Sequence, residues 1–89
     1  MSVTEDQVYQ ALSSELKTTN IKVIDESDGC GDKFMIYIST ALFDNVKLLQ
    51  RQRMVYDALS EYMPNIHAVS MKTWTSSQWE KKKDTIPGL

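Results

Sequence analysis

The feature that most constrains the fold is a pair of strand-like segments separated by one short polar stretch. Residues 33–38 alternate along the chain, so that the phenylalanine and both isoleucines lie on one face. Residues 21–25 form a second segment with the composition of a strand. Residues 26–32 between them are polar and hold two of the three glycines of the chain. This pattern predicts an antiparallel hairpin whose loop is longer than the two-residue minimum.

Helical patterns lie on both sides of this hairpin. The first helix is predicted from Thr4 to about Lys17, because Thr4 and Gln7 have the spacing of a capping box. A longer helix is predicted from about Asn45 to Met63, limited by Pro64. The face of this helix that is expected to enter the core carries four apolar residues at helical spacing: Leu48, Val55, Leu59 and Tyr62.

A third strand is predicted at residues 66–72. A second capping box, Thr75 to Gln78, begins a short last helix through Trp79. The element order is therefore α-β-β-α-β-α, an α+β fold. The helical crossover makes the second and third strands parallel, and one mixed three-stranded sheet with helices on one face is the simplest arrangement. The chain is expected to form a single domain over residues 1–80, followed by a frayed tail over residues 81–89.

Composition and charge narrow the function classes. The net charge of −2 does not favour a dedicated nucleic-acid binder, which would carry a basic surplus. The chain has one cysteine and hence no internal disulfide, which fits a reducing compartment. No secretory leader, transit peptide or membrane span is visible, so a cytoplasmic location is expected, with the nucleus as a second compartment. No catalytic motif is present, and enzyme activity is not expected.

Four segments, in the same order along the chain, resemble the BolA family, whose fold is similar to that of a KH domain. The similarity covers nearly the whole chain, from Thr4 to Trp79. The matching segments are Asp28-Gly29-Cys30-Gly31, Phe43-Asp44 with the run Leu48 to Val55, Ile66-His67-Ala68, and Ser77-Gln78-Trp79. Two positions depart from the family pattern: Gln52 replaces a usual histidine, and Asn45 replaces a usual glycine.

The cysteine in the loop resembles the cytosolic branch of the family that partners glutaredoxins. The resemblance implies a complex with a monothiol glutaredoxin and a shared two-iron, two-sulfur (2Fe-2S) cluster. The glutaredoxin supplies its cysteine and a glutathione thiol, and this chain supplies Cys30 and His67. Gly29, Gly31, Arg51 and Arg53 are the expected partner-binding residues. No cofactor is expected in the isolated protein, which is expected to be a monomer, with a weak homodimer as the alternative.

The ligand count supports a shared site independently of the resemblance. A 2Fe-2S cluster needs four thiolate or imidazole ligands, and the chain holds one cysteine and one histidine. A partner must therefore complete any such site. If the third strand lies parallel to the second, its start lies near the end of the loop. The topology therefore predicts that His67 and the loop containing Cys30 are neighbours.

Simpler interpretations accompany these residues. Cys30 alone is an ordinary exposed thiol, and a catalytic role is disfavoured because Asp28 and Asp32 raise the pKa of a nearby thiol. His67 alone is a half-buried strand residue. Arg51 borders the apolar stripe and is expected either to close over the sheet edge or to meet a partner carboxylate. Arg53 faces outward, where it can pair with Asp57. A solvated helix with surface pairs is an equally good interpretation of both arginines.

The alternative function, from a different class, is KH-like nucleic-acid binding or transcription regulation. The fold similarity invites it. The Gly-x-x-Gly clamp of KH domains is missing, however, because no glycine lies between Gly31 and Gly88.

Overall fold

The computed structural model describes residues 3–27 and 32–88. Helix α1 (Glu5–Leu16) begins at Thr4, as predicted. The Thr4 hydroxyl accepts from the Gln7 N–H at 3.1 Å, and the Gln7 side-chain oxygen accepts from the Thr4 N–H at 2.9 Å. The reciprocal capping box therefore forms, and α1 ends where Lys17 turns into the left-handed region at φ 52°.

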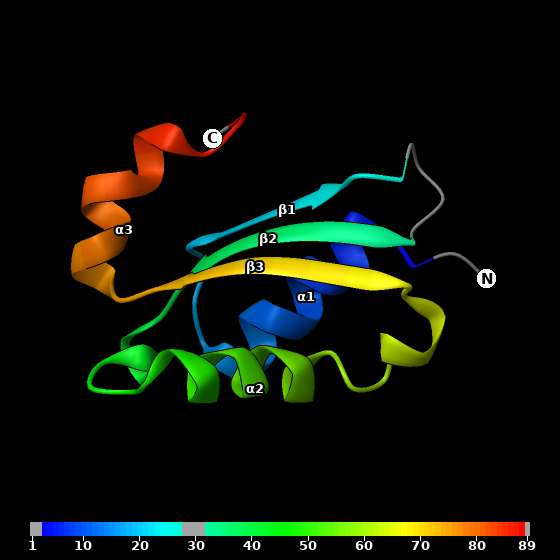
Figure 1. Cartoon of the computed structure of the whole chain (residues 1–89), viewed down its shortest axis with the longest axis horizontal. Coiled ribbons are helices and arrows are strands. Elements are labelled where there is room, and N and C mark those ends of the chain that lie inside the picture. The colour runs from blue at the N-terminus through cyan, green and yellow to red at the C-terminus, as the bar shows by residue number, and fades with distance from the viewer. Residues whose placement is uncertain (1–2, 28–31, 89) are drawn as a thin grey trace.

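The sheet has the predicted mixed topology, in the order β1-β2-β3 (Figure 1). Strands β1 (Ile21–Asp25) and β2 (Lys33–Ser39) pair antiparallel, and β3 (Ala68–Trp74) lies parallel to β2. The hairpin strands match their predicted positions to within one residue. Strand β3 begins and ends two residues later than predicted, which leaves His67 just outside its first residue.

Helix α2 (Leu48–Ala58) is shorter than the predicted 45–63 span. Asn45 adopts φ 61°, a left-handed conformation that cannot continue a helix, so α2 starts after it. Leu59 leaves helical geometry at φ −99° and ψ 9°. Pro64 then lies in a separate 3-10 turn, Met63–Asn65. A second 3-10 turn, Ala41–Phe43, connects β2 to the segment before α2.

The core prediction for α2 is half right. Val55 and Leu59 are fully buried. Leu48, predicted to lie in the core, is instead 59% exposed. It is the first residue of the shortened helix, and helical spacing alone could not tell that this turn is not covered. Tyr62 is only partly buried and packs against the edge of the core.

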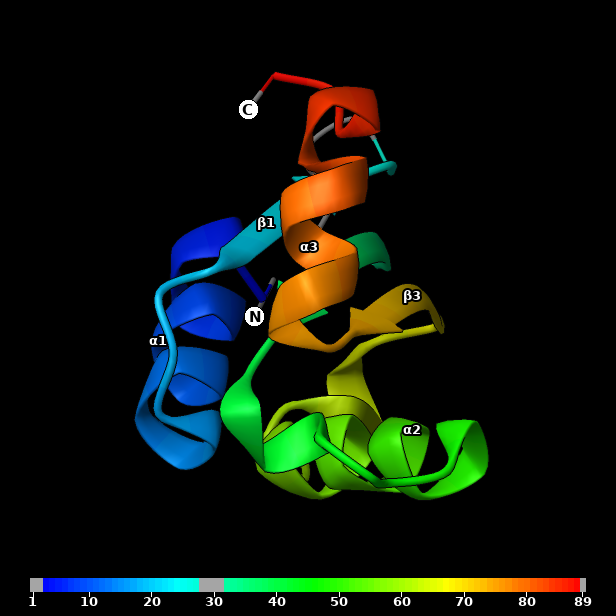
Figure 2. The ribbon, with the colours of Figure 1, turned by 90° about the vertical axis from the view of Figure 1, so that its left-hand side faces the viewer.

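Two helices cover one face of the sheet and the third contacts the other face. Helices α1 and α2 pack under the face that carries the buried Phe34, Ile36 and Ile38 (Figures 1 and 2). Because side chains alternate along a strand, Tyr37 lies on the opposite face, and so does its neighbour Trp74. Helix α3 (Ser76–Lys82) packs against this opposite face, whereas the sequence analysis predicted all helices on one face of the sheet.

The C-terminal segment is more ordered than the expected frayed tail. Helix α3 continues to Lys82, and a 3-10 turn follows at Lys83–Thr85. Ile86 is 4% exposed and packs with Trp74 and Trp79 in a second, smaller core. The two tryptophan rings meet edge to face, with 6.2 Å between their centroids. The sequence did not predict the return of Ile86 to the sheet. Among the described helices, none has the length and apolar character needed to cross a membrane.

Candidate functional site

The backbone of His67 is bonded to the end of the hairpin loop. The carbonyl of Asp32, the last loop residue, accepts from the His67 N–H at 2.8 Å and from the Ala68 N–H at 3.1 Å. These two hydrogen bonds begin the parallel pairing of β2 and β3, which continues with Lys33 opposite Ala68. The prediction that His67 lies beside the end of the loop is therefore confirmed.

The side chain of His67 is exposed. The simpler interpretation of a half-buried strand residue is wrong, because β3 begins one residue later and His67 belongs to the connection before it. The residue thus has a fixed main chain and an imidazole that is open to solvent or to a partner.

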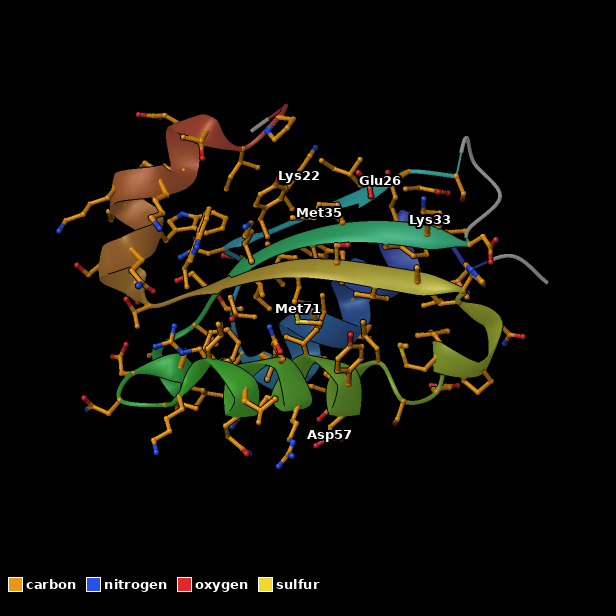
Figure 3. All side chains as sticks on the ribbon, in the orientation of Figure 1. Lys22, Glu26, Lys33, Met35, Asp57 and Met71 are labelled. Carbon is orange, nitrogen blue, oxygen red and sulfur yellow. The ribbon has the colours of Figure 1, made fainter. Side chains whose placement is uncertain are left out.

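The base of the loop is closed by a set of hydrogen bonds. The Glu26 N–H donates to the Lys33 carbonyl at 2.8 Å, and the Asp32 N–H donates to the Ser27 hydroxyl at 3.0 Å. Ser27 is itself held by the Asp25 carboxylate, which accepts from its N–H and from its hydroxyl. The two ends of the loop are therefore held together by hydrogen bonds where they leave the sheet. Figure 3 shows Glu26 and Lys33 at this edge.

The predicted ligand Cys30 and its glycine neighbours Gly29 and Gly31 lie outside the described residues. Within the described ranges, no three or more His, Cys, Asp or Glu side chains form a group that could hold a metal ion. The sequence holds one cysteine and one histidine in all, and a 2Fe-2S cluster takes four thiolate or imidazole ligands. The donor set of this chain therefore fits half of a shared cluster site.

Arg51 makes contacts within the protein itself. Its Nε donates to the Val46 carbonyl at 2.7 Å, and its Nη1 donates to the Thr73 carbonyl at 3.2 Å and to Gln78 Oε1 at 3.4 Å. The guanidinium thereby joins the start of α2, the end of β3 and the start of α3. Its expected role in partner binding remains a prediction, and the bonds show that the side chain closes over the end of the sheet, which is one of the two roles expected from the sequence.

Arg53, the other predicted partner-binding arginine, lies exposed on α2. The ion pair with Asp57 that the sequence suggested does not form: over the described ranges, the salt bridge present joins Lys83 and Glu80 at 3.0 Å. Arg53 is thus free to meet a partner, which is what its predicted role requires.

A concave region that sequence reasoning missed lies at the other end of the sheet. A groove of about 530 Å³ runs between the start of α2, the end of β3 and α3. Gln52, the residue in place of the family histidine, lines this groove and lies at the far end of β3 from His67. The sequence pattern did not predict this groove, because its lining residues come from three elements that are distant in sequence.

Comparisons with known proteins show which family this chain is similar to. The family model of BolA-like proteins matches residues 12–78. Protein BOLA2 of Arabidopsis thaliana is 44% identical over 79 residues, which cover 88% of this chain and 85% of the relative. BolA-like protein 2 of Mus musculus is 32% identical over 84 residues, or 93% of this chain and 98% of the relative.

Solved structures agree with this assignment. The crystal structure of a bol-like protein from Babesia bovis superposes with a TM-score of 0.83 at 41% sequence identity. The superposition covers 93% of this chain and 96% of that chain. Family model, sequence relatives and fold thus lead to one conclusion: the chain belongs to the BolA-like protein family.

Proposed function

We propose that this protein is a non-enzymatic partner of a monothiol glutaredoxin and shares a glutathione-assisted 2Fe-2S cluster with it. Its role would lie in iron–sulfur trafficking or iron regulation, in the cytoplasm and the nucleus. The observation that carries the proposal is the exposed His67, whose backbone is bonded to Asp32 at the end of the cysteine-bearing loop.

The proposed ligands of this chain are Cys30 and His67. Cys30 precedes Asp32 by two residues, and two peptide units span at most about 7 Å. A thiolate and an imidazole from these positions can therefore meet on one cluster. When bound, a cluster with this mixed ligand set has a higher reduction potential than an all-thiolate one. The chain contributes a fixed His67 backbone and a closed loop base, which limit how far the two ligands separate.

The glutaredoxin partner is supported by chemistry and by resemblance. This chain lacks two of the four ligands that the cluster needs, and a glutaredoxin with bound glutathione brings two thiolates. The exposed Arg53, on α2, and the loop glycines are the proposed contacts with that partner.

Nucleic-acid binding is the second candidate considered. A relative from Escherichia coli, 26% identical over 88 residues, is named DNA-binding transcriptional regulator BolA. In this chain the net charge is −2 and the glycine clamp of KH domains is missing, so that function is not favoured. A binding assay over a range of salt concentrations separates the two, because phosphate contacts give a steep salt dependence.

The test is anaerobic reconstitution of the complex. The protein is mixed with a monothiol glutaredoxin, glutathione, iron and sulfide, and the complex is isolated by size exclusion. A coloured one-to-one complex is expected, with visible absorption and circular dichroism that change in Cys30→Ala and His67→Ala. Asn65→Ala is the matched control, because Asn65 is exposed in the turn just before His67. Failure to form any complex would contradict the proposal.

A further inference from the structure

The groove at the far end of the sheet is lined by an unusual set of charges. Four cationic side chains border it, namely Lys47, Arg51, Lys72 and Lys82, and no aspartate or glutamate is among the lining residues. This occurs in a chain whose net charge is −2. Four positive charges with no acidic lining residue are therefore gathered in one hollow of a protein whose net charge is negative.

The start of α2 adds to this positive potential. The N-cap residue is Lys47, whose side chain makes no capping hydrogen bond, and the first turn has no acidic residue. The first N–H groups of a helix lack partners within the helix and carry the positive end of its dipole. In this eleven-residue helix they open beside the groove, because residues 46–48 form part of its wall. A helix start of this kind favours anions.

An independent observation comes from Thr73 on β3. Its side chain is 4% exposed and lines the groove, yet its hydroxyl oxygen has no hydrogen-bond partner among the described residues. Buried polar groups are nearly always hydrogen-bonded, so this hydroxyl, covered within the groove wall, is a donor that no described residue uses. Met71, two residues earlier, forms the inner wall between β3 and α2 (Figure 3).

Two of the four cationic groups, those of Arg51 and Lys82, have contacts that hold them before any ligand binds. Arg51 is fixed by its bonds to Val46, Thr73 and Gln78, which leave Nη2 without a hydrogen bond to any described residue. Gln78 is fixed in turn, since its Oε1 accepts from the Thr75 N–H at 2.9 Å. The Lys82 ammonium lies over the Trp74 ring, 5.7 Å from its centroid. A preorganised site of this kind loses little freedom on binding.

We propose that this groove binds a small molecule bearing a phosphate ester or diphosphate group. Two of the three Arg51 nitrogens are used internally, so the planar fork that recognises a carboxylate is not available. The remaining donors are the ammonium groups of three lysines, Arg51 Nη2 and the first N–H groups of α2, and they come from the region of α2, from β3 and from α3. This arrangement suits a tetrahedral oxyanion, and the volume of about 530 Å³ suits a ligand of small-molecule size.

This site is separate from the proposed cluster ligands. Strand β3 runs from Ala68, beside His67, to Trp74, beside the groove, which is about 20 Å at a normal strand rise. The inference therefore does not depend on the glutaredoxin complex, and each can fail alone.

The probe is inorganic phosphate and pyrophosphate, titrated into the isotope-labelled full chain at constant ionic strength and followed by amide NMR shifts. Saturable shifts are expected at residues 46–51 and 71–74, with pyrophosphate binding more tightly than phosphate. The double variant Lys47→Gln with Lys72→Gln is expected to weaken pyrophosphate at least tenfold. Thr73→Val, which removes the unpaired hydroxyl and keeps the shape, is expected to weaken it severalfold.

The matched control removes the same charge elsewhere. Lys17 and Lys33 are exposed and lie outside the groove, so Lys17→Gln with Lys33→Gln should leave pyrophosphate affinity within twofold. Equal weakening by both double variants would overturn the proposal, because it would indicate attraction by net charge alone. Shifts that do not saturate would also overturn it. So would single-stranded nucleic acid that shifts the same amides while pyrophosphate does not, since the site would then belong to a polymer.

Discussion

At the residue scale, His67 combines a rigid main chain with a free side chain. Its N–H and that of Ala68 share the Asp32 carbonyl, so the position of the His67 main chain beside Asp32 is set by backbone hydrogen bonds. A His67 substitution should consequently alter ligand chemistry without unfolding the protein. The exposure of each apolar side chain decides how much it contributes to the free energy of unfolding. Leu59 is fully buried, whereas Leu48, which was predicted to lie on the same helix face, is exposed.

The two leucines provide a matched pair for stability. Leu59→Ala should lower the free energy of unfolding by about 2–5 kcal/mol, because it leaves a cavity in the core. Leu48→Ala should change it by less than about 0.5 kcal/mol, because that side chain is already in solvent. Urea denaturation of the two variants measures the difference. Equal losses would mean that Leu48 is buried in solution.

At the element scale, the sequence predicted strands better than helix limits. Alternation marked β2 almost to the residue, because a two-residue period is broken at once by a turn, and strand-like composition marked β1. The apolar period of α2 continued past its real ends, since periodicity does not report the left-handed Asn45 or the departure at Leu59. Parallel pairing placed His67 correctly. The groove escaped prediction because three elements must be packed before its cations converge.

The left-handed conformation of Asn45, just before α2, can be tested by substitution. Its φ of 61° is tolerated by asparagine, and by the glycine usual in the resembling family, but is costly for other residues. Asn45→Ala should lower the free energy of unfolding by about 1 kcal/mol, whereas Asn45→Gly should have little effect. Thermal or chemical denaturation of the pair is the measurement. An alanine variant as stable as the glycine variant would show that the left-handed turn is absent.

At the scale of the whole molecule, the sheet has two ends with different chemistry. The loop end presents His67, and the opposite end presents the cationic groove between α2 and α3. The groove end is held by Arg51 and by the small second core in which Ile86 covers the tryptophans. The C-terminal residues therefore help to hold the fold together, although the sequence suggested a frayed tail.

Removal of residues 84–89 tests that contribution. Without Ile86, Trp74 and Trp79 should gain contact with water, so tryptophan fluorescence should shift to longer wavelength. The free energy of unfolding should fall by about 1.5–3 kcal/mol, which is the usual contribution of one buried aliphatic side chain. Ile86→Ser in the full chain should reproduce most of both effects. An unchanged emission spectrum in both variants would mean that the tail does not pack.

The central claim, that His67 and Cys30 are half of a shared cluster site, is tested most directly by the spectrum of the glutaredoxin complex. Visible circular dichroism of the one-to-one complex should differ between the unsubstituted protein and His67→Ala, and a second, distinct change should follow Cys30→Ala. Asn65→Ala should leave the spectrum as it is. A His67→Ala complex with an unchanged cluster spectrum would remove the imidazole from the ligand set and contradict the account.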